Sequence, residues 1–269
     1  MKRTRQTVFT VLRICVIVLC AGVFCYSAFQ LAKYGLMTLK EKKTEQDLLQ
    51  YRPPIEDVSS TAERDGTQAL PGEPPSADSE EKQESPKYTG LAALQQQNPE
   101  IIGWISIPDS RVEYPVLQTG DNAFYLTHNL YRQPLASGSV FMDYRCNFET
   151  DFQTILYGHH MKNGTMFADI RACRNEAFFR SHLTGYYTTP QRQYRLEFFA
   201  FLVVDASAPI FTVSFEDAAA REALLRYIDE TAMYRTELAV TADAHLFSLS
   251  TCTYEFDDAR AVLVGVVAP

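Results

Sequence analysis

Basic residues are in the minority among the charged residues of this chain. Its 269 residues include 25 Lys and Arg against 33 Asp and Glu, which gives a formal net charge of −8. Proteins that bind nucleic acid without sequence preference depend on positive charge, because contacts to the phosphate backbone dominate their affinity. The deficit of positive charge therefore argues against a general nucleic-acid-binding function.

Metal-binding and phosphate-binding patterns are also missing. No group of His, Cys, Asp and Glu has the spacing of a zinc or calcium site, and no glycine-rich loop has the form that cradles phosphate. We therefore expect no cofactor.

Cysteine is scarce and unevenly distributed. The chain has six cysteines: Cys15, Cys20 and Cys25 near the N-terminus, and Cys146, Cys173 and Cys252 in the remainder. An odd number outside the N-terminal group, without a regular spacing, does not indicate a disulfide framework. We interpret Cys146 and Cys173 as small buried residues, which leaves Cys252 as the candidate reactive thiol.

One long apolar run lies near the N-terminus. Residues 14–32 carry no charge, and their length approaches the ~20 residues that a helix needs to cross a bilayer. Basic residues precede the run, namely Lys2, Arg3, Arg5 and Arg13. The alternative is a cleaved signal peptide, but the small residues that would mark its cleavage site lie inside the run. We expect a transmembrane helix at 14–32, and the positive-inside rule places residues 1–13 in the cytoplasm and the rest outside the cell.

The next part of the chain is poor in apolar residues. Residues 33–52 are charged and compatible with a helical stalk, whereas residues 53–87 are rich in Pro and acidic residues. Such a composition buries too little apolar surface to offset the entropy cost of ordering the backbone. We predict a stalk and disordered linker at 33–87, followed by a folded domain at 88–269.

Strand patterns dominate the predicted domain. Short β-rich runs separated by turn residues extend from residues 101–107 to a final run at 260–267. Helical patterns cover residues 89–97, 165–174 and 216–232. About eight strands without regularly intervening helices predict a mainly β fold with added helices, and favour a barrel over a doubly wound sheet.

Three reactive side-chain types stand at the ends of these strand-like runs. Cys252 closes an alternating run that begins at Leu246, and Arg260 opens the last run. Upstream, the motif Tyr-Gly-His-His at residues 157–160 closes another apolar run. A thiol, an imidazole and a permanent cation are sufficient for covalent acyl transfer, as nucleophile, acid/base and electrostatic stabiliser.

These motifs resemble the sortases, the cysteine transpeptidases of Gram-positive cell surfaces, and their details are similar to class B. The class B features are Leu-Ser-Thr-Cys at 249–252 followed by Arg260, Tyr-Gly-His-His-Met at 157–161, and Tyr-Pro-Val at 114–116 followed by Asp-Asn at 121–122. The resemblance covers roughly residues 88–267. It implies an eight-stranded β-barrel with added helices.

The resemblance also implies the roles of three residues. Cys252 is the expected nucleophile, His159 the acid/base, and Arg260 the residue that positions substrate and stabilises the oxyanion. His160 is the alternative to His159, but the family pattern selects the first histidine after Tyr-Gly. The alternative for Arg260 is a surface ion pair with one of the aspartates at 257–258.

Further positions are carried over as substrate-binding residues: Asn122, Leu126, Ile210, Phe211, Ser250 and Thr251. Class B members often have an acidic residue directly after the cysteine, where this chain has Thr253. A substrate contact from that position is therefore not carried over from the resemblance.

The resemblance implies a membrane-anchored sortase that cleaves a C-terminal sorting signal after Thr and transfers the protein to an amine. The expected partners are surface proteins that carry sorting signals, and a peptidoglycan precursor or a pilin lysine as the amine acceptor. One alternative is a cell-wall cysteine peptidase or amidase, in which the cysteine usually precedes the histidine. The other is a non-catalytic surface module that binds peptides, against which the intact Cys252, His159 and Arg260 argue.

Overall fold

The structure is a computed structural model, and it describes residues 13, 17–32, 35, 47–56, 86–253 and 256–269. The chain separates into two units, Met1–Gln50 and Tyr51–Pro269. Residues 14–16 of the predicted transmembrane helix and 57–85 of the predicted linker lie outside the described residues.

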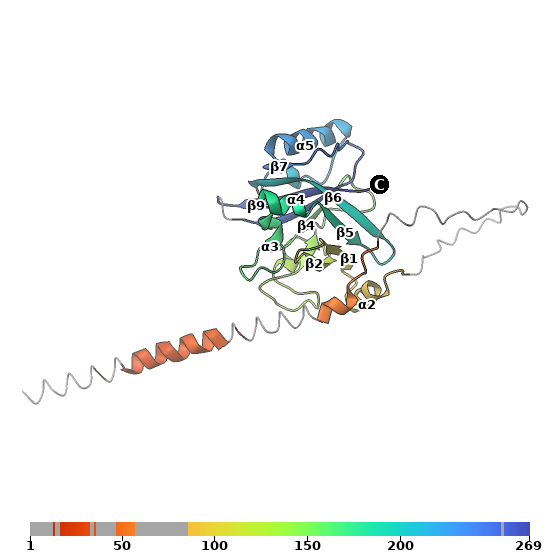
Figure 1. The fold of residues 1–269 in the computed structure, drawn as a ribbon. Helices are drawn as coiled ribbons and strands as arrows, with labels where there is room; N and C mark the ends of the chain where they lie inside the picture. The colour runs from red at the N-terminus through yellow and green to blue at the C-terminus, as the bar shows by residue number, and fades with distance from the viewer. Residues whose placement is uncertain (1–12, 14–16, 33–34, 36–46, 57–85, 254–255) are drawn as a thin grey trace, which may run out of the picture. The chain divides into compact units, whose positions relative to one another are not determined.

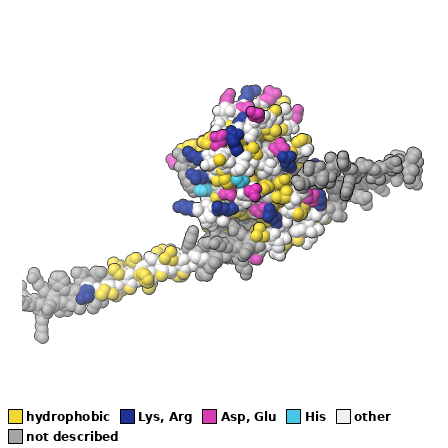
Figure 2. Space-filling view, viewed as in Figure 1, with side chains coloured by type: hydrophobic (Ala, Val, Ile, Leu, Met, Phe, Trp, Pro, Cys, Tyr) yellow, Lys and Arg dark blue, Asp and Glu magenta, His cyan; other side chains and the backbone are white. Residues whose placement is uncertain are grey.

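In the first unit, residues 17–32 form a helix. Its hydrophobic side chains are exposed, including Val18, Phe24 and Leu31, and Figure 2 shows them along the helix. No helix among the described residues combines the length and the apolar character that crossing a bilayer requires.

Within the described residues of the second unit, eight strands close into a barrel (Figure 1). Their order is β5-β1-β2-β3-β4-β8-β9-β6, and β6 pairs with β5 to complete the ring. The strands are β1 (Ile101–Ser106), β2 (Glu113–Leu117), β3 (Val140–Met142), β4 (Gln153–Tyr157), β5 (Thr184–Thr188), β6 (Gln193–Asp205), β8 (Leu246–Cys252) and β9 (Ala259–Val267). The short β7 (Tyr234–Arg235) adds to the far half of β6. The predicted mainly β fold with an eight-stranded barrel is confirmed.

The long strand β6 explains how the domain builds two apolar layers. Its side chains alternate between two faces, as in any strand. Phe201 belongs to a buried cluster with Phe247 and Leu263, whereas the next residue, Leu202, belongs to a second cluster with Ile228 of the long helix. Because both faces of this part of β6 are covered, residues 198–204 form a continuous apolar run.

Apart from the helix at residues 17–32, the described helices are few and short. The helices labelled in Figure 1 are α2 (Thr89–Gln97), α3 (Ala168–Ala172), α4 (Glu176–Ser181) and α5 (Ala218–Thr231), with 3-10 turns η1 (Leu49–Tyr51), η3 (Phe124–Leu126) and η4 (Pro209–Phe211). Asp217 caps α5, since its carboxylate accepts a hydrogen bond from the Ala220 N–H at 2.8 Å. Figure 1 shows α5 beside β7, along one side of the barrel.

Residues 51–56 pack against the barrel, in a part of the chain where the sequence predicts a linker. Arg52 forms an ion pair with Glu113 at 2.8 Å, and the Glu56 N–H donates to the side chain of Gln193 at 2.9 Å. The folded unit therefore includes described residues that precede the predicted domain start at residue 88.

Candidate active site

Three neighbouring strands bring the candidate thiol, imidazole and guanidinium to one end of the barrel. The antiparallel pairing of β8 with β9 sets Cys252 opposite Arg260. The parallel pairing of β4 with β8 sets Tyr157 beside Ser250, so that His159, two residues later, continues to the level of Cys252. Parallel neighbours end at the same edge of a sheet, and this topology joins motifs that lie far apart in the sequence.

A cleft of about 380 Å³ opens at this end of the strands. The predicted site residues that line it are Asn122, Leu126, His159, Phe211, Ser250, Thr251, Cys252 and Arg260. Ile210 does not line the cleft, because its side chain is fully buried in the cluster that also contains Leu224 and Ile228 of α5. Of the two adjacent residues chosen from η4, only Phe211 faces the site.

Cys252 is the accessible thiol of the folded unit. Its side chain is half-buried, whereas Cys146 and Cys173 are only 5% and 1% exposed. Burial raises the pKa of the Cys146 thiol and of the Cys173 thiol to about 12. Because the thiolate is the nucleophile, these two cysteines are inert at neutral pH, and their prediction as small buried residues is confirmed.

A glycine and a returning loop hold His159 at the end of β4. A Cβ atom on Gly158 would lie 2.8 Å from the ring of Phe167, so this position needs glycine for the close packing. The Phe167 N–H donates to the His159 carbonyl at 2.9 Å, which closes the loop between them. The backbone that carries the imidazole is thereby fixed from two sides.

Within the part of the chain that the structure describes, the imidazole of His159 makes one hydrogen bond. Its Nε2 lies 2.8 Å from the backbone carbonyl oxygen of Leu126 in η3. A carbonyl oxygen only accepts, so Nε2 carries the hydrogen and Nδ1 is the nitrogen left for proton exchange. The carboxylate of Asp121 accepts from the N–H groups of Ala123 and Phe124 at 2.7 and 2.8 Å, and so orders the turn that presents this carbonyl.

The structure separates His159 from His160. His160 does not line the cleft, and its backbone instead forms an isolated bridge with Met166. The choice of His159 as the cleft histidine agrees with this arrangement.

Within the described ranges, the Arg260 guanidinium makes one hydrogen bond. Its Nη1 donates to the carbonyl of the neighbouring Ala259 at 3.1 Å. Among the described residues, which include the exposed Asp257 and Asp258, Arg260 forms no ion pair. Its remaining N–H groups are available to a ligand in the cleft, and the alternative of a surface ion pair is not seen.

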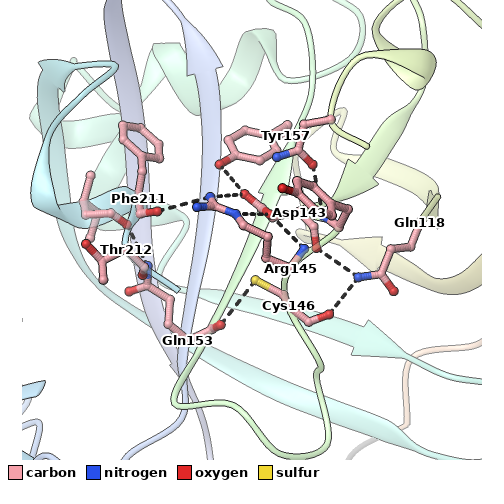
Figure 3. Close-up of polar contacts among 11 residues, drawn as sticks. Gln118, Asp143, Arg145, Cys146, Gln153, Tyr157, Phe211 and Thr212 are labelled. Carbon is pink, nitrogen blue, oxygen red and sulfur yellow. Dashed lines mark hydrogen bonds and ion pairs between the residues drawn. The ribbon is translucent and has the colours of Figure 1, made fainter. Parts of the chain in front are cut away.

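An ion pair joins the buried Asp143 to Arg145, whose partly exposed side chain lines the same cleft, and Figure 3 shows the contacts of the pair. Asp143 is fully buried, and Arg145 donates to its two carboxylate oxygens from Nε at 2.9 Å and from Nη2 at 2.7 Å. The hydroxyl of Tyr157 donates to the same carboxylate at 3.0 Å. Burial acts to raise the pKa of Asp143, but the hydrogen bonds from Arg145 and Tyr157 outweigh it and hold the pKa below its usual value.

Comparisons with known proteins place this arrangement in a family. No protein-family model matches the chain. Sortase B of Listeria monocytogenes is 34% identical over 178 residues, which cover 65% of this chain and 72% of that protein. The chain belongs to the class B sortases. Sortase B of Staphylococcus aureus is 28% identical over 178 residues, with the same 65% and 72% coverage.

Solved sortase structures share the fold. Sortase B from Bacillus anthracis in complex with AAEK1 superposes with a TM-score of 0.62 at 35% identity, covering 66% of this chain and 84% of that chain. The Staphylococcus aureus sortase B–substrate complex gives a TM-score of 0.64 at 27% identity, covering 69% of this chain and 87% of that chain. The family and the class B assignment predicted from the sequence motifs are therefore confirmed.

The site of this sortase contains residues that the sequence patterns did not reveal. Phe141, Arg145, Tyr157 and Ala206 line the cleft beside the predicted residues. One local feature of the sequence could have pointed to Arg145. Asp143 is an acidic residue directly after the apolar strand β3, and a buried carboxylate needs a partner. Its partner Arg145 follows two residues later, but only the folded loop shows that the side chains meet.

Proposed function

We propose that this sortase is a membrane-anchored cysteine transpeptidase that cleaves a C-terminal sorting signal after Thr. It then transfers the acylated protein to an amine, supplied by a peptidoglycan precursor or a pilin lysine. The observation that carries the proposal is the convergence of Cys252, His159 and Arg260 on one cleft. A relative, the Staphylococcus aureus sortase B, has been solved in complex with substrate.

The first half of the reaction forms a thioester. The Cys252 thiolate attacks the carbonyl carbon of the Thr, and the carbonyl oxygen becomes an oxyanion. The C–N bond then breaks, and the leaving amine takes a proton from Nδ1 of His159, since Nε2 is held by the Leu126 carbonyl. The acyl part of the substrate stays on the sulfur.

The second half of the reaction makes a new amide. The acceptor amine attacks the thioester carbon, His159 Nδ1 removes a proton from the nitrogen, and the C–S bond breaks to restore the thiolate. One amide bond is broken and another is formed, so the reaction balances without a cofactor and the enzyme returns to its starting state.

Arg260 and Ser250 supply hydrogen bonds to the substrate in this scheme. The unengaged N–H groups of Arg260 stabilise the oxyanion as charge develops on it. The buried Oγ of Ser250 has no hydrogen-bond partner among the described residues, although it stands two residues before Cys252 and its residue lines the cleft. A peptide backbone in the cleft would satisfy this hydroxyl, which otherwise carries the cost of an unpaired buried polar group.

The membrane anchor belongs to the same proposal. The uncharged run at 14–32 follows a basic N-terminus, and this order favours a single-pass protein with residues 1–13 in the cytoplasm and the catalytic domain outside. Protease treatment of intact cells that produce the full chain tests the orientation. The proposal expects the domain to be degraded, and protection of the domain would contradict it.

The transfer reaction is tested by product analysis. Purified enzyme, a Thr-containing sorting peptide and an excess of a glycine oligomer or a lysine-containing peptide should yield a new amide, identified by mass spectrometry. Release of the free Thr carboxylate alone, at every amine concentration, would instead support a hydrolytic peptidase. Neither product in the wild-type enzyme would favour the non-catalytic peptide-binding module.

A further inference from the structure

The carbonyl of Leu126 in η3 decides which nitrogen of His159 is free. Its oxygen accepts from Nε2 of the imidazole at 2.8 Å. In a neutral histidine, the hydrogen bond made by one ring nitrogen sets the tautomer, and with it the nitrogen that can exchange a proton. Because η3 presents this carbonyl, the contacts that fix η3 also fix the acid/base.

Tyr125, the middle residue of η3, is fully buried and does not line the cleft. Its hydroxyl donates to the carboxylate of Glu100 and accepts from Nδ2 of Asn98 at 3.0 Å. Burial raises the pKa of Tyr125 to about 12, and the hydrogen bond to Glu100 acts in the same direction. The hydroxyl therefore keeps its proton at neutral pH and stays a donor. Two oriented hydrogen bonds thus tie the middle of η3 to the segment between α2 and β1.

A glycine packs directly against the carbonyl that holds His159. Gly138 has a φ of +59°, in the left-handed region that favours glycine. A Cβ atom at this position would lie 2.6 Å from the Leu126 oxygen, whereas real Cβ contacts essentially never fall under 3.0 Å. The next residue, Ser139, donates its N–H to the Tyr125 carbonyl at 2.9 Å, which holds the two segments together. A side chain at position 138 would therefore force the Leu126 carbonyl and the segment behind it apart.

Arg132 contacts η3 from an unfavourable backbone conformation. Its φ of 59° lies in the left-handed region, which is uncommon for a residue with a side chain. Its guanidinium forms an ion pair with Glu100 and lies 4.5 Å from the centre of the ring of Phe124, the first residue of η3. Backbone strain of this kind persists only where the surrounding contacts hold it, and it clusters at functional sites. The strain therefore points to a role for η3 beyond closing one end of the barrel.

We propose that Tyr125 and Gly138 are positioning residues of this sortase, which hold the Leu126 carbonyl against Nε2 of His159 and so keep Nδ1 free for proton exchange. The inference rests on the proposed function, because it takes His159 as the acid/base. A residue that only stabilised the fold would leave the tautomer of His159 unchanged, so the tautomer separates the two roles.

Each of two variants removes one support of η3. Gly138→Ala places a methyl group against the Leu126 oxygen. Tyr125→Phe removes the two hydroxyl hydrogen bonds but keeps the ring, and it leaves Glu100 paired with Arg132.

The chain offers a matched control for each variant. Gly120→Ala is the control for Gly138→Ala, because a Cβ atom at Gly120 meets nothing within 4 Å. Tyr187→Phe is the control for Tyr125→Phe. Tyr187 is also buried, and its hydroxyl donates to the Ile102 carbonyl at 3.5 Å, outside the cleft.

The deciding measurement is the tautomer of His159. The full chain, carrying histidine with isotope-labelled nitrogen at Nδ1 only and reconstituted in lipid, is observed by solid-state nuclear magnetic resonance at pH about 8.5, where a neutral imidazole predominates. The chain has five histidines, and the His159 signal is the one lost in His159→Ala. Wild type, Gly120→Ala and Tyr187→Phe should show an Nδ1 without hydrogen. In Gly138→Ala and Tyr125→Phe, a second signal from protonated Nδ1 should appear.

Kinetics should show the same dependence on His159. In Gly138→Ala and Tyr125→Phe, kcat for cleavage of a sorting peptide should fall by about 10- to 10²-fold, the scale that misplacing a catalytic group by up to ~1 Å costs, while KM stays within about twofold. Combined with His159→Ala, either substitution should lower the remaining rate by less than about twofold, because a residue that acts through His159 then has nothing left to position.

An unchanged Nδ1 signal in both variants, whatever their rates, would give Tyr125 and Gly138 a purely structural role and overturn the inference. So would losses of rate that add to the loss in His159→Ala. If Gly138→Ala does not fold, Tyr125→Phe decides alone. A wild-type enzyme that forms no acyl-enzyme with any peptide would overturn the proposed function, whereas the Nδ1 signal would still decide whether these two residues hold the imidazole.

Discussion

Replacing Arg260 by alanine separates a catalytic role from a structural one. If the guanidinium stabilises the oxyanion, its loss removes one preorganised donor and should lower kcat by about 10²–10³, or ~2.7–4 kcal/mol of transition-state stabilisation. The folded state should hardly respond. The one hydrogen bond that the Arg260 guanidinium makes among the described residues, to the Ala259 carbonyl at 3.1 Å, contributes only about 0.5–1.5 kcal/mol to the free energy of unfolding.

The assay pairs steady-state cleavage of a fluorogenic sorting peptide with thermal unfolding of the same protein. For a domain of this size, ~1 kcal/mol corresponds to a shift of about 2–4 °C in melting temperature, so Arg260→Ala should melt only a few degrees lower. Arg260→Lys should restore part of kcat, because an ammonium keeps the charge but cannot reproduce the planar fork.

The control removes the neighbouring acidic residues. A double variant, Asp257→Asn with Asp258→Asn, should leave kcat unchanged, since neither aspartate pairs with Arg260 in the structure. Near-normal kcat in Arg260→Ala, together with a clear loss of melting temperature, would refute the oxyanion role and reduce Arg260 to a structural residue.

Three further predictions follow from the same geometry. His159→Ala should lower the rate of peptide cleavage by at least ~10²-fold, the scale of a general acid/base, whereas His160→Ala should lower it far less. Equal losses, or a larger loss in His160→Ala, would contradict the assignment of His159 as the acid/base. Cys252→Ala should abolish cleavage with a normal circular dichroism spectrum, whereas Cys173→Ala should keep its activity and lose only stability; an inactive but folded Cys173→Ala would contradict this. Asp143 has a folded pKa below its unfolded value of ~3.9, so its stabilising effect is present above that pH and is lost as the pH falls through the folded pKa. Acid denaturation of Asp143→Asn should therefore show a weaker pH dependence below pH ~4 than that of the wild type. Identical curves would contradict a lowered pKa of Asp143 in the folded state.

Much of the fold could be predicted because it depends on local patterns. Alternating and continuous apolar runs identify strands, and a barrel is the simplest way to close so many short strands without regular helices. The predicted helix at 216–232 corresponds to α5, whereas the predicted helix at 165–174 is reduced to the short α3. The contacts of residues 51–56 were not predictable, because a short Pro-containing segment carries no signal for the surface on which it packs.

The residues at the centre of the site could be predicted because they stand at strand ends. The residues of the cleft walls could not, because their role depends on the direction of each side chain. Cys252 and Arg260 stand at strand termini, and a sequence can locate strand termini to within a few residues. Which of Ile210 and Phe211 faces the cleft depends on the rotation of the 3-10 turn η4 against α5, and only the packed structure determines it. The pairing of Asp143 with Arg145 likewise depends on the shape of one loop.

The most direct measurement for the central claim is mass spectrometry of the enzyme mixed with a Thr-containing sorting peptide and quenched at low pH. If Cys252 is the nucleophile, the enzyme should carry an adduct whose mass equals the acyl part of the peptide, located on Cys252 by peptide mapping and discharged when an amine is added. Cys252→Ala should carry no adduct. An adduct on another residue, or peptide cleavage without any adduct in rapidly quenched samples, would contradict the assignment of Cys252 as the nucleophile.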